Sequence, residues 1–143
     1  MKNQFVTFEI ALKLKELGFN FPCFSAYTEN GNLMDIGDYA DYDEIGKLNG
    51  HSYSISCLSP LWQQCVDWFR DKHHTNIEIN RFPNISKWGF IVTDMTIIPK
   101  QQTIKENINM SLKVTDVRRF DEYFECREQA ILKGIELING RNI

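Results

Sequence analysis

The sequence has 143 residues, of which 43% are hydrophobic, 24% charged and 13% aromatic. This size and composition are typical of one globular domain that folds without a disulfide or a metal, so we expect a single domain over residues 1–143. Sixteen lysines and arginines against nineteen acids give a net charge of −3, which excludes a chain-wide positive field for nucleic acids or anionic membranes but leaves a local basic patch possible.

The first helix and the first hairpin have clear end signals. Thr7 predicts the N-cap of a helix that Gly18 ends, because apolar residues recur at helical spacing between them. The pair Asn30-Gly31 is typical of a tight turn with positive φ angles. It predicts two antiparallel strands, at residues 23–28 and 33–36.

An acidic loop and a second helix are expected next. Glycines interrupt any period in residues 37–52, which we interpret as a loop, followed by a short strand at 52–56. Ser59 as N-cap and Pro60 at the first position then predict an amphipathic helix that ends near His73.

The C-terminal half predicts a second hairpin and a last helix. Two β-type runs, at 77–80 and 88–93, flank turn residues, and residues 112–118 are expected to add an edge strand after a long loop. A helix is expected from Asp121 to Gly140. Together these elements predict an α+β fold, with a mainly antiparallel sheet of four to five strands and three helices packed on one face.

No segment has the length or apolar content of a membrane span, and the N-terminus does not resemble a signal peptide. We therefore expect a soluble cytoplasmic protein without membrane contact. Its cysteines are too widely spaced for a disulfide framework, so we expect free thiols at Cys23, Cys57, Cys65 and Cys126.

Several segments carry a resemblance to a known group of proteins. They are residues 8–19 (FEIALKLKELGF), 59–64 (SPLWQQ), 67–70 (DWFR) and 127–133 (REQAILK). In these segments the chain resembles small uncharacterised proteins from gut bacteria and their phages, and the resemblance covers most of its length. It implies an accessory protein of a bacterial or phage genome and a cytoplasmic location. It implies no activity and no site residue.

The leading functional hypothesis is a non-enzymatic module that binds another protein. Tyr39 and Tyr42 offer large contact surfaces among Asp38, Asp41 and Asp43, and such acids steer basic partners. We expect the whole acidic stretch 35–44 to lie at the surface, because five acids without a base are costly to bury. The alternative is that both tyrosines only pin this stretch to the core. The identity of the partner and the oligomeric state stay open.

Nucleic-acid binding is the second hypothesis. It rests on the basic end of the second helix and on nearby basic residues, which are Arg70, Lys72, His73, His74, Arg81 and Lys87. The same part of the chain also carries acids, and this weakens the case for a phosphate-binding surface.

An enzyme is the third alternative. A cysteine nucleophile needs a nearby base, and His51 or His73 are candidates to approach Cys57 or Cys126 in the fold, although no catalytic pattern surrounds any of them. Cysteine and histidine spacings do not match those of structural zinc sites. We assign no catalytic, cofactor-binding or metal-binding residue, and we expect no cofactor.

Overall fold

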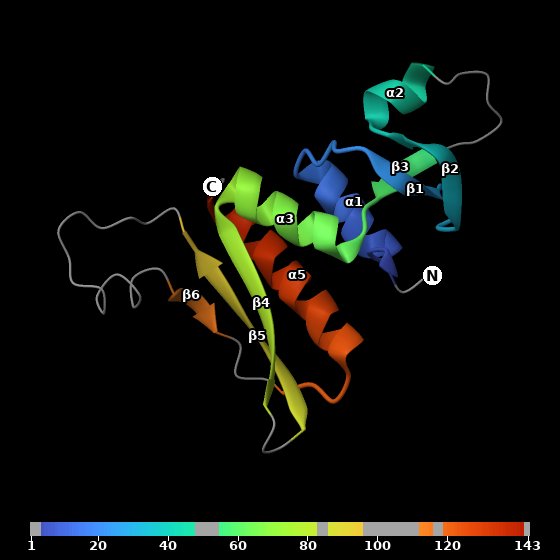
Figure 1. Cartoon of the computed structure of the whole chain (residues 1–143). Helices are drawn as coiled ribbons and strands as arrows, with labels where there is room; N and C mark the ends of the chain where they lie inside the picture. The colour runs from blue at the N-terminus through green and yellow to red at the C-terminus, as the bar shows by residue number, and fades with distance from the viewer. Residues whose placement is uncertain (1–3, 48–54, 83–85, 96–111, 116–118, 142–143) are drawn as a thin grey trace. The chain divides into compact units, whose positions relative to one another are not determined.

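The computed structural model describes residues 4–47, 55–82, 86–95, 112–115 and 119–141 (Figure 1). Along these residues the chain forms four helices and six strands, and every strand pairing is antiparallel. The α+β class is confirmed. The strands form two three-stranded sheets, however, where we expected one sheet of four to five. The chain divides into two compact units, Met1–Cys65 and Val66–Ile143, which we describe separately.

The N-terminal unit is a small sheet with a helix packed on it. Its strands lie in the order β2-β1-β3, so β1 is central and pairs with both neighbours. Helix α1 contacts β3. The elements in chain order are α1 (Phe8–Glu16), β1 (Cys23–Thr28), β2 (Leu33–Ala40), α2 (Tyr42–Lys47) and β3 (Ile55–Ser59).

The ends of α1 follow from local hydrogen bonds. The Thr7 hydroxyl accepts from the backbone N–H of Ile10 at 3.3 Å, as its N-cap role predicts. At the other end Gly18 adopts a φ of +92°, and the backbone N–H of Phe19 donates to the carbonyl of Leu14 at 2.9 Å. This is the Schellman arrangement, which a positive φ makes possible and which places the buried Phe19 under the helix. Both predicted helix ends are confirmed.

The segment after β3 corrects one prediction. Ser59 ends β3, is fully buried, and donates its hydroxyl to the carbonyl of Val6, so it is not the N-cap of the next helix. That helix, α3 (Trp62–His73), begins three residues later and ends where we expected. At the start of α3 the side-chain oxygen of Gln64 accepts a hydrogen bond from the backbone N–H of Leu61 at 2.9 Å. This bond satisfies the backbone N–H of the residue that precedes the helix, a donor that a capping serine does not satisfy with its own side chain.

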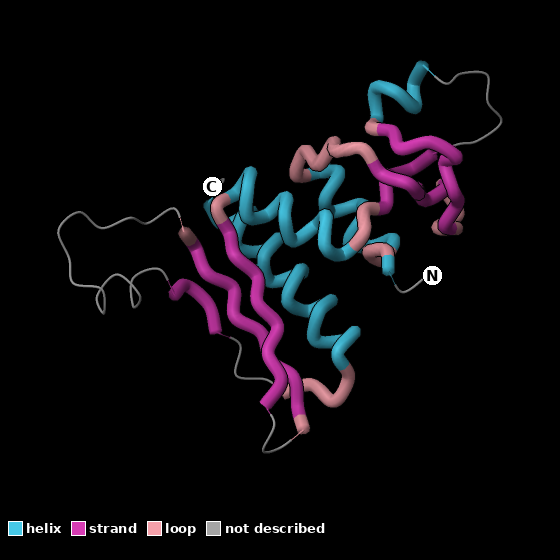
Figure 2. The backbone as a smooth tube through the Cα atoms, in the orientation of Figure 1, coloured by secondary structure: helices cyan, strands magenta, loops and turns pink. Residues whose placement is uncertain are grey.

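The C-terminal unit has its own sheet, with the strand order β4-β5-β6 (Figure 2). The predicted second hairpin and edge strand are confirmed, and the hairpin strands are longer than expected. A Cβ atom on Gly134 would lie 3.1 Å from Ile77 and 3.5 Å from Phe69, so α5, β4 and α3 meet closely at that glycine. The elements are β4 (Thr75–Phe82), β5 (Lys87–Asp94), β6 (Leu112–Thr115) and α5 (Tyr123–Arg141).

Burial along α3 follows the predicted amphipathic pattern except at Val66 and Asp67, which are both half-buried, and α5 buries Ile131, Ile135 and Ile138 while Phe124 is 51% exposed. On α3, Trp62, Cys65 and Phe69 are buried, whereas Gln63 and Arg70 are exposed. Most of the long loop that we expected before β6 lies outside the described residues. None of the helices in the described parts of the chain is both long enough and apolar enough to cross a membrane.

Candidate functional site

Strand β2 carries a large bulge, in which several residues lie opposite a single residue of β1. The ladder pairs at Cys23 and Ser25 enclose one residue, Phe24, on β1, but the same interval on β2 holds four residues, 36–39. The additional residues interrupt the strand pairing and change the direction of the side chains next to the bulge. The bulge therefore determines which side chains the sheet presents at this position.

Gly37 makes the bulge possible. Its φ is +89°, a conformation that a residue with a Cβ atom adopts only with strain, and its backbone N–H donates to the Asp35 carboxylate at 2.8 Å. Nothing lies within 4 Å of a Cβ atom built on Gly37, so only the backbone angle requires glycine here.

Gly37→Ala is expected to lower the free energy of unfolding by about 1–2 kcal/mol, because the alanine must hold a left-handed conformation. Urea titration followed by circular dichroism measures this loss. Gly18→Ala is the matched control, since Gly18 has a φ of +92° and equally open surroundings. Equal losses in both variants support a purely conformational cost, and a stability unchanged by Gly37→Ala would show that the bulge does not need the positive φ.

Phe21 lies two residues before β1, Phe24 and Tyr39 lie at this bulge, and we call these three exposed residues the aromatic patch. Their exposed fractions are 38%, 51% and 50%, which is high for large rings. The ring centroids of Phe24 and Tyr39 are 4.7 Å apart, and Phe21 packs edge-on against the buried Phe19 at 5.8 Å. Phe24 and Tyr39 thus pack on each other and Phe21 packs on Phe19, while a large part of each exposed ring faces solvent.

Gln64 of α3 holds the aromatic patch in position. Its side-chain amide donates to the carbonyl of Pro22 and to the hydroxyl of Tyr39, both at 3.1 Å. The amide oxygen accepts from Leu61, as described above, which fixes the orientation of the whole side chain. Sequence reasoning identified Tyr39 but missed Phe21, Phe24 and Gln64. The available signal was Phe24 itself, a large apolar residue at the solvent-facing position of a strand whose neighbours are buried.

Acidic residues follow the aromatic patch along the chain, but in a helix and not in the predicted loop. Strand β2 continues to Ala40, and α2 begins at Tyr42. The carboxylate of Asp41 accepts from the backbone N–H of Glu44 at 2.9 Å and so caps α2. The spacing Asp-x-x-Glu is a capping-box signal that our loop interpretation overlooked.

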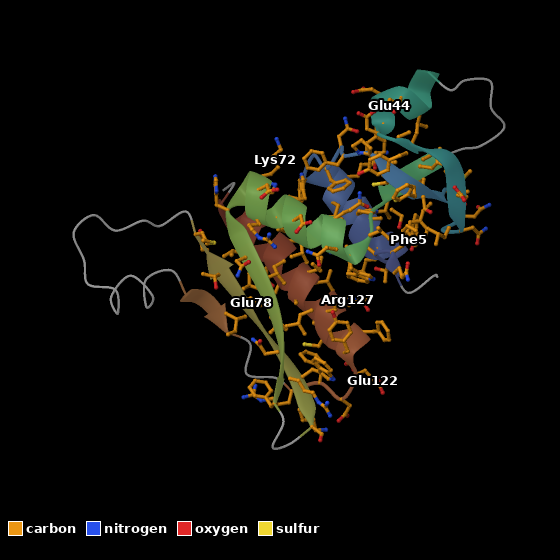
Figure 3. The ribbon with its side chains drawn as sticks, in the orientation of Figure 1. Phe5, Glu44, Lys72, Glu78, Glu122 and Arg127 are labelled. Carbon is orange, nitrogen blue, oxygen red and sulfur yellow. The ribbon has the colours of Figure 1, made fainter. Side chains whose placement is uncertain are left out.

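The start of α2 is also tied to the residue before Phe21. The backbone N–H of Tyr42 donates to the side chain of Asn20 at 2.8 Å. This bond brings the acidic first turn of α2 close to the aromatic patch in the fold. Asp43 and Glu44 are exposed there, and Glu44 is labelled on α2 in Figure 3.

Tyr42 has the pinning role that we weighed as the alternative. Its hydroxyl accepts from the backbone N–H of Leu58 at 2.8 Å, and the Lys15 ammonium lies 5.5 Å from its ring centroid. Burial raises the pKa of Tyr42 to about 12. Tyr42 therefore secures α2 to β3, whereas Tyr39 and Asp43 face solvent. The side chain of Asp38 lies outside the described part of the structure.

The basic residues of the nucleic-acid hypothesis do not form one surface. Arg70, Lys72, His73 and His74 lie at the end of α3, whereas Arg81 and Lys87 lie at the far end of the β4-β5 hairpin. Arg81 lies seven residues after His74 along extended chain, which is a span of about 23 Å.

Several of these basic residues already have partners. Arg70 forms an ion pair with Asp67 at 3.4 Å, and Lys87 forms one with Asp121. His73 packs edge-on against Trp68 with ring centroids 4.5 Å apart. The predicted basic surface is thus divided and partly neutralised.

The cysteines have environments that disfavour a nucleophile. All four are buried free thiols. Burial raises the pKa of Cys57 to about 11 and that of Cys23 to about 12, and it also raises the pKa of Cys65. A nucleophilic cysteine needs the opposite shift. His51, one of the candidate bases, lies outside the described residues, and the described parts of the chain bring together no group of three or more metal-ligating side chains.

Comparisons of the chain with protein-family models, with curated proteins and with solved structures found no match. The resemblance to small proteins of gut bacteria and phages stays a prediction.

Proposed function

We propose that the protein is a non-enzymatic interaction module whose aromatic patch binds a basic segment of a partner protein. The supporting observation is the bulge in β2, which holds Tyr39 against Phe24 while half of each side chain faces solvent. Exposed aromatic rings of this size dominate binding energy when a partner covers them. Gln64 orients Tyr39 before binding, which reduces the entropy lost on association.

The charge near the aromatic patch favours a basic partner. Residues 29–46 contain six acids and no lysine or arginine, a charge of −6 compared with −3 for the whole chain. The remaining residues therefore carry +3. Acids of one sign beside an apolar surface attract partners of the opposite sign and repel acidic ones. The resemblance described above supports an accessory role in a bacterial or phage genome, and together with the sequence pattern it supports a cytoplasmic location.

Selection of peptides from a random twelve-residue display library tests this proposal. We expect the selected peptides to be enriched in lysine and arginine, and their affinity to fall as salt is raised. Tyr39→Ala or Phe24→Ala should weaken binding of a selected peptide by at least about tenfold, as expected for central aromatic anchors. Isothermal titration calorimetry measures the dissociation constants.

Phe124→Ala is the matched control, because Phe124 is also 51% exposed but belongs to the C-terminal unit. It should leave peptide affinity unchanged. Peptides without enrichment in basic residues, or equal affinities for the Tyr39→Ala variant and the unmodified protein, would refute the proposal.

A further inference from the structure

The C-terminal unit presents a second exposed aromatic cluster, which we call the arginine–aromatic surface: Arg81, Trp88, Tyr123, Phe124 and Arg127. Arg81 and Trp88 are register partners on β4 and β5, and the Arg81 guanidinium lies 5.9 Å from the Trp88 ring centroid. The Trp88 ring in turn packs edge-on against Tyr123 of α5 at 4.9 Å. Arg81, Trp88 and Tyr123 thus form a continuous row of contacts from the sheet to the helix.

The helix side of this surface is built around Arg127. Its guanidinium lies 5.4 Å from the ring centroid of Tyr123 and 5.0 Å from that of Phe124. Tyr123 and Phe124 are nevertheless 36% and 51% exposed. Arginine, tyrosine and tryptophan are the residues most enriched among those that dominate protein interfaces.

Backbone contacts hold the surface in a fixed shape. Trp88 and Phe120 exchange two backbone hydrogen bonds, at 2.8 and 2.9 Å, and Lys87 pairs with Asp121. These contacts join the start of β5 to the segment that leads into α5. Because the side chains are positioned before a partner arrives, association loses less conformational entropy.

The charges around the exposed rings indicate the kind of partner. Two arginines lie among the rings, but Glu122 directly precedes α5 and the first two turns of α5 carry Glu125 and Glu128 (Figure 3 labels Glu122 and Arg127). Glu128 is one helical turn from Phe124, so it shares a side of the helix with that ring. Three carboxylates repel a phosphate backbone. A surface of mixed sign is, however, complementary to itself when a two-fold axis places its acids against the arginines of another copy.

We propose that the arginine–aromatic surface binds a second copy of this chain about a two-fold axis. A surface defined by five side chains fits a weak dimer, with a dissociation constant on the order of 10 µM. This proposal is independent of the function proposed for the aromatic patch, because the two surfaces belong to different units and share no residue.

Sedimentation equilibrium of the full chain between 5 and 500 µM tests the dimer. Phe124→Asp should raise the dissociation constant more than tenfold, since a two-fold interface loses the ring twice and gains a charge in its place. Phe24→Asp is the control, with the same residue at the same 51% exposure on the other unit, and it should leave the dimer intact. Circular dichroism verifies that both variants are folded.

Charge reversal provides a second test that does not depend on the rings. Arg81→Glu makes the surface acidic and Glu128→Lys makes it basic, so each variant alone should dimerise at least tenfold more weakly than the unmodified chain. An equimolar mixture of the two should recover dimers, because opposite surfaces then meet. A chain that stays monomeric to 500 µM overturns the proposal, as do an unaffected Phe124→Asp variant and a mixture that recovers no dimer. Tight binding of a single-stranded oligonucleotide that separates the dimer would favour nucleic acid as the partner instead.

Discussion

Phe69→Ala is expected to lower the free energy of unfolding by about 3–5 kcal/mol, the cost of removing a fully buried phenylalanine and leaving a cavity. Phe69 is 0% exposed and packs against Trp68 with ring centroids 5.4 Å apart. Its ring also lies close to Gly134 of α5, where the absence of a side chain lets α5 approach both Phe69 of α3 and Ile77 of β4. Because domains are typically stable by only about 5–15 kcal/mol, the loss takes a large share of the total.

Urea titration of the purified variant, followed by circular dichroism, measures this effect. Phe124→Ala is the control in the same unit, because it removes the same atoms from a half-exposed position. Its loss should stay within about 1 kcal/mol, which is the scale of an exposed cation–π contact. Similar losses in the two variants would mean that Phe69 is not a central part of the core.

We also expect the protein to lose stability steeply above pH 9, because three thiols of the N-terminal unit are buried. Burial raises the pKa of Cys57 to about 11 and that of Cys23 to about 12, from 9.0, and raises the pKa of Cys65 as well. Between pH 9 and pH 11 the unfolded chain releases these protons while the folded chain keeps them. Each thiol then lowers the free energy of unfolding by up to about 1 kcal/mol per pH unit.

Urea titrations at pH 8.5, 9.5 and 10.5 measure this slope. Below pH 9 the folded and the unfolded chain both keep their thiol protons. The thiols therefore do not change the free energy of unfolding with pH in that range. Cys57→Ala should make the slope above pH 9 shallower by up to about 1 kcal/mol per pH unit, even where its absolute stability also changes. A slope that Cys57→Ala leaves unchanged would contradict the assignment of the pH dependence to these thiols.

The elements with explicit end signals could be predicted from the sequence. Thr7 and Gly18 bound α1 because one supplies a side-chain acceptor and the other a positive φ, and both effects act within a few residues. The turn at Gly31, whose φ is +79°, likewise joins the two predicted strands, although Asn30 does not share the positive φ that we expected of the pair. Local chemistry is sufficient to specify such features.

Features that depend on distant contacts could not be predicted. Alternating residues identify strands but not their neighbours, so the sequence did not reveal that β1 pairs with β3 or that the strands divide between two sheets. Serine is a residue type that often caps helices, yet the hydroxyl of Ser59 donates a hydrogen bond to the backbone carbonyl of Val6, 53 residues away. A tertiary contact there overrides the local signal.

The candidate site could be predicted in part. Tyr39 was expected to be exposed and is, because it lies in a stretch too acidic to bury. Its neighbour Phe24 belongs to another strand, and the amide that orients Tyr39 comes from Gln64, 25 residues away. No pattern of spacing brings these three residues together; the bulge and the packing of α3 do.

The bulge in β2 also determines where the sequence tolerates inserted residues. The ladder pairs on its two sides, at Ser25 and Cys23, do not depend on how many residues lie between them on β2. A residue inserted after Gly37 therefore lengthens the bulge without reversing the faces of the flanking strand segments, whereas an insertion elsewhere in β2 shifts its register. New recognition surfaces can arise here by small insertions as well as by substitution, while the rest of the sheet keeps its pairing.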